Sequence, residues 1–326
     1  MKVIIPAAGE GTRLRPHTHT LPKALLFVAG KPILAHIIDD IIPLRPSQVI
    51  VIVGYKGDLV EEYVRENYAG LNLEFVHQSE RRGIGHAVAA CADHADSDEP
   101  LLIILGDTII RTDLAGITSC AHNALGVKEV NDPRRFGVCE VSGERITHLV
   151  EKPEDPPSNL ALVGLYFLRD ARELFRAVRH IIENDLATRG EYQITDALER
   201  MIQQGAKFEP FVIGDWFDCG KPEAMLETNR KLLEDQVQRP APEGSVVIAP
   251  VSIARGATVE SSIIGPWVSL DVGAVVRHSI VRDSIVSAGA CVTDSVLEQS
   301  LVGVNAVVSG AFHRIDVGDS SEIHLK

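Results

Sequence analysis

The feature that most constrains the fold of this chain is a repeat in its last quarter. After residue 244, branched aliphatic residues recur every five or six positions. A coarser repeat of 16–17 positions overlies them, carried by small residues at Gly256, Gly273 and Gly289 and at Ser262, Ser279 and Ser295. Short apolar strands joined by small-residue turns at this period predict a solenoid of about four or five triangular coils with aliphatic side chains stacked inward. A β-sandwich of short strands is the alternative.

The first two-thirds of the chain alternate strand and helix patterns. Strands are expected at residues 3–5, 49–53, 73–76 and 101–105, and helices at 32–41, 58–67 and 86–94. This βαβαβ order predicts a mostly parallel sheet with helices on both faces. The Pro-rich segment 238–244 has the composition of a linker. We therefore expect two domains, at residues 1–237 and 238–326.

Charge and composition exclude several classes of protein. The net charge of -13 argues against a protein that coats nucleic acid, but a phosphate site needs only a few local cations and backbone amides. The five cysteines show no CxxC spacing, so neither a zinc site nor a redox dithiol is indicated. No apolar run resembles a signal peptide or reaches the roughly 20 residues of a membrane span, so a cytoplasmic location is expected.

A glycine-rich loop follows the first predicted strand. Backbone N–H groups near Gly9 and Gly11 can approach phosphate oxygens closely. Arg13 adds a bidentate donor with a permanent charge, and Lys23 adds a second cation. The dinucleotide fingerprint fails because Leu14 stands where it requires glycine. The Gly-Lys-Ser/Thr ending of a Walker A loop is also missing.

The loop becomes specific when it is combined with the motifs that follow it. The run from Gly9 through Thr12, Arg13 and Leu14 to Pro16, then Pro22-Lys23 and Gly30-Lys31-Pro32, resembles the signature of the sugar-nucleotide pyrophosphorylase family. Residues 132–138, 151–153, 162–166, 190–196 and 220–223 are most similar to glucose-1-phosphate thymidylyltransferases with a C-terminal β-helix. The tail repeat itself resembles the hexapeptide repeats of left-handed β-helices.

This resemblance implies an α/β fold, with a Rossmann-like mixed-sheet nucleotidyltransferase domain followed by a short left-handed parallel β-helix. It implies an enzyme that joins a nucleoside triphosphate to a sugar 1-phosphate and releases pyrophosphate. The family's loop wraps the triphosphate, which assigns nucleotide binding to Ala8, Gly9, Gly11 and Thr12. Arg13 would stabilise the reacting phosphates, and Lys23 would assist.

Base recognition is expected in the segment 78–87. An amide such as Gln78 can donate and accept, which matches the O4 and N3–H edge of uracil or thymine. Family members that use UTP or dTTP place a Gln and a Gly here, which assigns base contacts to Gln78 and Gly83. A solvated loop glutamine is the alternative.

Two aspartates are the candidate metal ligands. Asp107 ends a predicted buried strand, where ligands of parallel sheets bind and where a carboxylate suits Mg²⁺ beside substrate phosphates. Asp218, far away in the sequence, matches the second carboxylate of the family's metal-binding pair. Without that match Asp218 would be taken for a turn residue.

The sugar-phosphate side is assigned by resemblance to further segments. Lys152 can neutralise the phosphate of the sugar 1-phosphate, and Glu151 can accept hydrogen bonds from sugar hydroxyls. Gly137 and Gly164 match positions where the backbone approaches the sugar closely, and Glu191 matches a segment that reads the sugar ring.

Several questions stay open from the sequence. The expected nucleotide is dTTP or UTP and the expected sugar is glucose 1-phosphate, but Ala8, Thr108 and Cys219 depart from the common thymidylyltransferase pattern. One alternative is a bifunctional enzyme like the N-acetylglucosamine-1-phosphate uridylyltransferases with acetyltransferase activity, although His278 and His313 show no obvious supporting residues. Another is a non-catalytic regulatory subunit. The solenoid is expected to mediate homo-oligomer assembly, with residues 312–326 as a possible cap.

Overall fold

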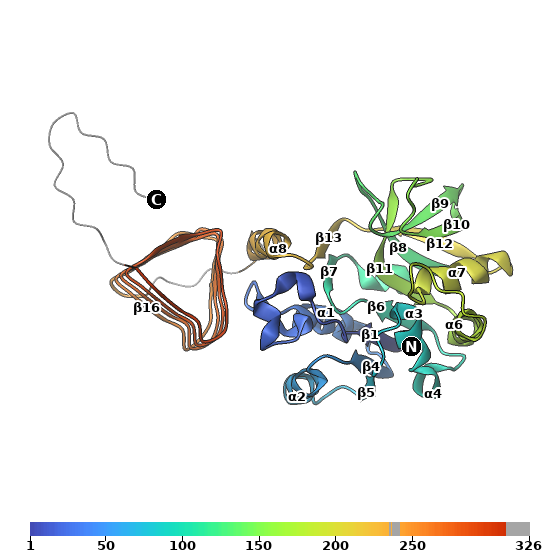
Figure 1. Cartoon of the computed structure of the whole chain (residues 1–326), viewed down its shortest axis with the longest axis horizontal. Coiled ribbons are helices and arrows are strands. Elements are labelled where there is room, and N and C mark those ends of the chain that lie inside the picture. The colour runs from blue at the N-terminus through green and yellow to red at the C-terminus, as the bar shows by residue number, and fades with distance from the viewer. Residues whose placement is uncertain (235, 237–241, 311–326) are drawn as a thin grey trace. The chain divides into compact units, whose positions relative to one another are not determined.

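The computed structural model describes residues 1–234, 236 and 242–310. The expected cap at 312–326, His313 and most of the expected linker lie outside the described residues. The chain forms two compact units (Figure 1): the first holds Met1–Leu26 and Lys31–Met225, and the second holds Phe27–Gly30 and the chain from Leu226 onward. No helix in the described ranges is long and apolar enough to cross a bilayer.

The first unit is built on a mixed sheet, for which the described residues give nine strands in the order β5-β4-β1-β6-β11-β8-β12-β10-β9. Four of them are parallel neighbours: β1 (Lys2–Pro6), β4 (Gln48–Val53), β5 (Leu73–His77) and β6 (Leu101–Ile104). The helices that connect them are α1 (Ile33–Ile41), α2 (Gly57–Asn67), α3 (Ile84–Ala89) and α4 (Ala92–Ala95). This part matches the predicted βαβαβ order, except that the helix expected at 86–94 is two short helices.

The other half of the sheet is largely antiparallel. Its strands are β8 (Asn123–Glu129), β9 (Gly137–Ser142), β10 (Arg145–Glu151), β11 (Leu160–Leu168) and β12 (Phe208–Val212). Strand β11 runs antiparallel to both β6 and β8, and only β12 pairs in parallel, with β8. The predicted mixed α/β class is therefore confirmed, and the parallel arrangement is confined to the N-terminal strands.

The remaining elements outside the two halves of this sheet and outside the repeat region are short strands, helices and 3-10 turns. They are the strands β2 (Phe27–Val28), β3 (Lys31–Pro32), β7 (Thr108–Arg111) and β13 (Asp215–Asp218), the helices α5 (Leu114–Thr118), α6 (Ala171–Glu183), α7 (Ile194–Gln203) and α8 (Pro222–Glu234), and the 3-10 turns η1 (Thr12–Leu14), η2 (His17–His19), η3 (Lys23–Leu25) and η4 (Ile42–Leu44). The short strands β7 and β13 pair antiparallel and have no counterpart among the predicted strands.

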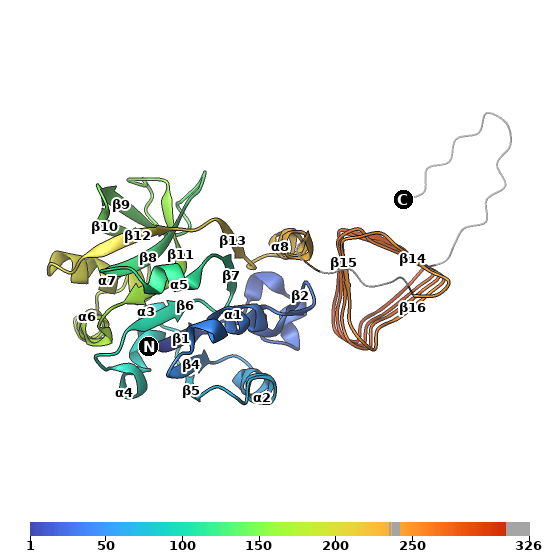
Figure 2. The same ribbon diagram turned by 180° about the vertical axis from the view of Figure 1, so that it is seen from behind.

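Both faces of the inner parallel strands β1, β4 and β6 are buried, as their continuous aliphatic runs require, whereas the edge strand β5 is largely half-buried. Ile4, Ile50 and Ile103 belong to a core cluster that also contains Leu174 of α6 and Leu198 of α7. The alternate strand residues are buried as well; they include Val3, Ile5, Val49, Val51 and Leu102. Figure 2 gives the reverse view of these layers. Burial on both faces makes the sheet a rigid base for the loops at its strand ends.

The second unit contains the predicted solenoid. Its described strands form three parallel sheets of four strands each, and Figure 1 shows the triangular cross-section that they enclose. The strands are β14 (Val246–Val247), β15 (Val251–Ile253), β16 (Thr258–Glu260), β17 (Ile263–Ile264), β18 (Val268–Leu270), β19 (Val275–Arg277), β20 (Ile280–Arg282), β21 (Ile285–Val286), β22 (Cys291–Thr293), β23 (Val296–Glu298), β24 (Leu301–Val302) and β25 (Val307–Ser309). The β-helix prediction is confirmed; its left-handed winding stays a prediction.

The repeat spacing has a direct structural cause. Val259, Val276 and Val292 stack in successive coils of one sheet, with Val276 and Val292 fully buried. At one corner, Ser279 N donates to Ser262 Oγ at 3.1 Å, and Ser295 N donates to Ser279 Oγ at 3.1 Å. These serines therefore join consecutive coils through backbone groups that a corner would otherwise leave unpaired.

One buried asparagine joins several segments of the second unit by hydrogen bonds. Asn229 of α8 has no exposed surface. Its Oδ1 accepts from Ala29 N at 3.0 Å and from Ser269 Oγ at 2.6 Å, and its Nδ2 donates to Trp267 O at 3.0 Å. One side chain thus joins α8, a coil of the β-helix and the short turn at Ala29, which lies some two hundred positions earlier in the chain.

We expect Asn229→Ala to lower the free energy of unfolding of the second unit by about 2–4 kcal/mol, because it leaves buried donors without an acceptor. Urea unfolding followed by circular dichroism measures the loss. Asn67→Ala is the control: Asn67 is exposed and its side chain donates to Tyr63 O one turn earlier, so a change within about 0.5 kcal/mol is expected. If the two variants lost equal free energies of unfolding, the stabilising role of the Asn229 hydrogen bonds would be contradicted.

Candidate active site

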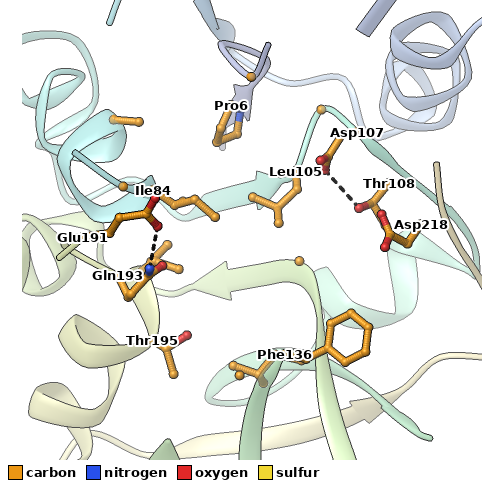
Figure 3. A pocket seen from close by; sticks show the side chains of 18 of the residues that line it. Pro6, Ile84, Leu105, Asp107, Thr108, Phe136, Glu191, Gln193, Thr195 and Asp218 are labelled. Atoms are coloured by element: carbon orange, nitrogen blue, oxygen red, sulfur yellow. Dashed lines mark hydrogen bonds between the residues drawn. The ribbon is translucent and has the colours of Figure 1, made fainter. Parts of the chain in front are cut away.

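A cavity of about 660 Å³ opens in the first unit where β1 and β6 end. Pro6 of β1 and Leu105, directly after β6, lie at its floor, at the carboxyl ends of two parallel strands. In Figure 3, Asp107, Thr108 and Asp218 lie together on one side of the cavity, and Glu191, Gln193 and Thr195 lie on another. This is the position at which ligands bind in open α/β sheets.

The glycine-rich loop contributes Ala8, Gly9 and Arg13 to the cavity wall, whereas Gly11 and Thr12 do not line it. Gly11 has a positive φ of 67°, and a Cβ there would lie 3.0 Å from the Cβ of Lys23. Gly11 therefore allows the loop to pack closely against the turn that carries Lys23.

Lys23 and Asp107 form an ion pair across the cavity floor. Lys23 Nζ lies 2.8 Å from Asp107 Oδ2; the Lys23 side chain is 6% exposed and that of Asp107 is 46% exposed. Thr108 Oγ1 also donates to Asp107 Oδ1 at 3.2 Å. Burial acts to raise the pKa of Asp107, but the charge and hydrogen bond of Lys23 outweigh it and hold that pKa below its ordinary value.

Asp218 is brought to Asp107 by the pairing of β13 with β7. In this antiparallel pair Asp218 lies opposite Thr108, the residue after Asp107. Arg13 lies beside Asp218: a Cβ built on Gly220 would lie 2.7 Å from Arg13 Nη2 and 2.9 Å from Asp218 Oδ1. Three of the predicted residues, from loops about a hundred positions apart, thus share one side of the cavity, and glycine at 220 leaves room for them.

Two carboxylates on the wall of this cavity, those of Asp107 and Asp218, fit a hard divalent cation. Mg²⁺ is usually held by one or two carboxylates together with waters and substrate phosphates, rather than by an all-protein cage. In the described ranges no group of three or more His, Cys, Asp and Glu side chains converges on one point. Asp107 and Asp218 are donors of the type that Mg²⁺ takes from proteins.

Gln78 and Gly83 lie in the segment that joins β5 to α3. Gln78 Nε2 donates to Gly83 O at 3.3 Å, and both residues line the cavity. Gly83 has a φ of 101°, and a Cβ there would lie 2.5 Å from Tyr192 O. Only glycine fits this position, because the backbone of Tyr192 passes directly against it.

Glu151 is the last residue of β10 and forms an ion pair at 3.0 Å with Lys152, which follows the strand. Glu151 is held from the other side by Thr195, whose Oγ1 donates to Glu151 Oε2 at 2.7 Å. Gly137 packs against both of them, since a Cβ there would lie 2.9 Å from Thr195 Oγ1 and 3.1 Å from Glu151 Oε2. Arg189 Nη2 donates to Lys152 O at 2.8 Å and adds a cation to this wall.

Gly164 and Glu191 complete the predicted set, and both line the cavity. Gly164 has a φ of 81°, and a Cβ there would lie 2.6 Å from Leu105 Cδ1. Glu191 Oε2 accepts from Gln193 Nε2 at 2.8 Å.

Sequence reasoning did not single out several lining residues; they are Arg134, Arg135, Phe136, Tyr166, Arg189, Gln193, Thr195 and Trp216. Some lie inside motifs that the sequence offered: Gln193 and Thr195 follow Glu191, and Arg189 precedes Gly190-Glu191. Trp216 and Phe136 form an edge-to-face aromatic pair with ring centroids 4.8 Å apart. That contact joins segments 80 positions apart, so no local pattern indicates it.

Comparison with known proteins identifies the class of this site. The family model described as nucleotidyl transferase matches residues 2–235. The chain belongs to the nucleotidyl transferase family. It is therefore a nucleotidyltransferase, and the predicted enzyme class is confirmed.

Named relatives are sugar-1-phosphate nucleotidyltransferases. UTP–glucose-1-phosphate uridylyltransferase AglF of Haloferax volcanii is 36% identical over 248 residues, which are 73% of this chain and 99% of the relative. Glucose-1-phosphate thymidylyltransferase of Streptomyces antibioticus is 34% identical, and the match spans 100% of both chains. The bifunctional protein GlmU of Methanocaldococcus jannaschii is 34% identical, but only 61% of its length is matched.

Solved structures share the fold of the catalytic unit. A protein from Bacillus anthracis assigned as a glucose-1-phosphate thymidylyltransferase superposes with a TM-score of 0.62 at 27% identity, covering 73% of this chain and 98% of that one. A UDP-glucose pyrophosphorylase complexed with UDP-glucose also gives 0.62, at 24% identity. The predicted family, fold class and general reaction are thus confirmed.

We expect Lys23→Met to destabilise the enzyme in a pH-dependent way. The depressed pKa of Asp107 stabilises the fold above the carboxyl's unfolded pKa, and this stability is lost as pH falls through the folded value. Without Lys23, burial dominates and raises the pKa of Asp107. The free energy of unfolding of the variant at pH 7 is then lower by on the order of 1 kcal/mol, because solvent screening of this partly exposed carboxyl limits the effect. The loss should shrink below about pH 4 as the carboxyl is protonated.

Urea unfolding of both proteins at several pH values, with a chelator present, measures this difference. Lys23→Met/Asp107→Asn is the control, because it lacks the titrating carboxyl. A loss in the single variant that is as large well below pH 4, where the carboxyl is protonated, as at pH 7 would contradict the ion-pair assignment.

Proposed function

We propose that the enzyme transfers a thymidylyl or uridylyl group from dTTP or UTP to glucose 1-phosphate and releases pyrophosphate. The observation that supports this most is the convergence of Arg13, Lys23, Asp107, Lys152 and Asp218 on one cavity from distant segments. Relatives named as glucose-1-phosphate thymidylyltransferase and uridylyltransferase support the choice of sugar and of both bases.

In this proposal the nucleotide occupies the side formed by the glycine-rich loop and the segment 78–83. The Gln78 amide donates to O4 and accepts from N3–H of the base. Ala8 and Gly9 present backbone to the phosphates at the cavity wall, and Gly11 and Thr12 shape the loop behind it. Because thymine and uracil share the edge that Gln78 reads, both dTTP and UTP fit this contact.

The sugar 1-phosphate occupies the opposite side. Lys152, with Arg189 beside it, offsets the charge of its phosphate, while Glu151 and Glu191 accept hydrogen bonds from sugar hydroxyls. Gly137 and Gly164 leave room for the ring. Thr195 holds the Glu151 carboxylate in place for this contact.

A phosphate oxygen of the sugar phosphate attacks the α-phosphorus in line, and pyrophosphate leaves from the far side. The chain supplies position and charge: Arg13 stabilises the developing negative charge, Lys23 assists, and Lys152 reduces the repulsion between the two phosphates. Nucleotidyltransferases of this family generally use a divalent metal. Asp107 and Asp218 would hold Mg²⁺, which neutralises phosphate charge when it is bound.

The alternatives from the sequence are less well supported. A non-catalytic subunit has no need for the complete set of cations and carboxylates that lines this cavity. His278 does have an acidic neighbour, because Asp294 Oδ1 lies 3.6 Å from its Nδ1, but the pair is on the surface of the β-helix. The cytoplasmic location, the domain boundary at residue 237 and the homo-oligomer stay predictions from the sequence.

The nucleotide and sugar are tested by a matrix of five nucleoside triphosphates against several sugar 1-phosphates, with pyrophosphate release as the readout. Highest kcat/KM is expected for dTTP or UTP with glucose 1-phosphate. A clear preference for a purine nucleotide would overturn the role of Gln78, and acetyl transfer to an amino-sugar phosphate would revive the bifunctional alternative.

We expect Asp107→Asn and Arg13→Ala each to lower kcat by about 10²–10³-fold, as for the loss of one group that stabilises transition-state charge. Pyrophosphate release measures the rate, and circular dichroism checks the fold. Asp58→Asn, an exposed carboxylate in the first turn of α2, is the control and should keep full activity. A well-folded Asp107→Asn enzyme with full activity would remove the metal assignment.

A further inference from the structure

Two consecutive arginines reach different loops around the cavity. Arg81 and Arg82 lie in the base loop, defined here as residues 78–85. Arg81 contacts the phosphate loop, residues 7–15, and Arg82 contacts the sugar loop, residues 185–193. The base loop is therefore tied by neighbouring side chains to the other two substrate-binding segments.

The first tie is electrostatic. Arg81 Nη1 pairs with Glu10 Oε2, and Arg15 Nη2 pairs with Glu10 Oε1. The Glu10 side chain is 16% exposed, whereas those of Arg81 and Arg15 are about half exposed. The hydrogen bonds from Arg81 and Arg15 hold the pKa of Glu10 below its ordinary value, so Glu10 stays ionised. A carboxylate next to Gly9 would repel a triphosphate, and Arg81 offsets that repulsion.

The second tie combines side-chain and backbone contacts. Arg82 Nη2 donates to Tyr192 OH at 2.8 Å, and the guanidinium lies over the Tyr192 ring, 4.8 Å from its centroid. Tyr192 OH donates in turn to Asp185 Oδ1 at 2.6 Å. Tyr192 N donates to Arg82 O and Gly85 N donates to Tyr192 O, each at 2.8 Å. Tyr192 is 3% exposed, so these contacts form a packed junction.

Tyr192 lies between two residues that line the sugar side of the cavity. Its neighbours Glu191 and Gln193 both line the cavity and hydrogen-bond to each other. On the other side of the junction, Gly83 lies against Tyr192 O and accepts from Gln78. A base that orders Gln78 and Gly83 therefore also orders Tyr192 and, through it, Glu191.

We propose that Arg81 and Arg82 are positioning residues that couple the three loops, so that a bound nucleoside triphosphate prepares the site for the sugar 1-phosphate. The inference rests on the proposed function. Two sites coupled in this way change each other's affinity by the same factor, typically about 5–150-fold.

The test measures the dissociation constant of glucose 1-phosphate with and without an α,β-methylene analogue of dTTP, by isothermal titration. The wild-type enzyme should bind the sugar phosphate more tightly when the analogue is present. In Arg82→Ala and Tyr192→Phe this ratio should fall towards one, with kcat less affected than the KM for the sugar phosphate. Tyr192→Phe keeps the ring and removes only the hydroxyl, so it addresses the junction without a cavity.

Arg172→Ala is the matched control, because Arg172 on α6 pairs with Asp170 two positions earlier and does not line the cavity; its ratio should equal that of the wild type. A wild-type ratio of one, or an unchanged ratio in folded Arg82→Ala, overturns the coupling. These outcomes differ from a wild-type enzyme without turnover on any pyrimidine nucleotide, which overturns the proposed function instead.

The electrostatic tie has its own test. Arg81→Ala should raise the KM for dTTP, because Glu10 keeps only Arg15 as a partner. Glu10→Gln/Arg81→Ala should recover part of the affinity for dTTP, since it removes the unpaired charge. An Arg81→Ala defect that the added Glu10→Gln leaves unchanged overturns the charge-offsetting role of Arg81.

Discussion

The site depends on the parallel pairing of β1 with β6. The pairing ends in one backbone hydrogen bond, from Gly106 N to Pro6 O at 3.0 Å, and a Cβ on Gly106 would lie only 2.8 Å from that oxygen. This close approach brings the start of the phosphate loop and Asp107 to the same strand edge. The Lys23–Asp107 pair and the Asp218 strand then build outward from it, because β7 starts at the next residue.

Several charged side chains at the cavity are paired with one another within the chain, although its lining has seven Arg and Lys side chains against four Asp and Glu side chains. Two acids that line the cavity have a cationic partner: Asp107 pairs with Lys23, and Glu151 pairs with Lys152. Glu10, which does not line the cavity, pairs with Arg81 and Arg15. A cationic cavity without these acids would bind inorganic phosphate and pyrophosphate indiscriminately. Under the proposed function, substrate phosphates and a divalent cation would exchange partners with these pairs, which would account for both signs of charge at a site for anionic ligands.

The parts of this architecture that local pattern determines were predictable. Continuous aliphatic runs indicated the parallel strands, the spacing of 16–17 positions indicated the β-helix, and a composite of short motifs indicated the family. The β7–β13 pair was not predictable, because four-residue strands more than a hundred positions apart carry no periodicity of their own. The same applies to the contact between Arg82 and Tyr192, whose partners are 110 positions apart. Site residues were found where resemblance supplied them and missed where only tertiary contacts bring them to the cavity.

The second unit is not a continuous stretch of the chain. The Pro-rich segment predicts a boundary at residue 238, whereas the second unit takes in Phe27–Gly30 and the chain from Leu226, and Asn229 holds the Ala29 backbone there. These four residues lie in the chain between η3 (Lys23–Leu25) and α1 (Ile33–Ile41), two elements of the first unit. Ala29 has a φ of 46°, a left-handed conformation that is unfavourable for a residue with a Cβ. Its hydrogen bond to Asn229 helps to hold this conformation, which means that α8 and the β-helix support a turn four residues beyond Leu25.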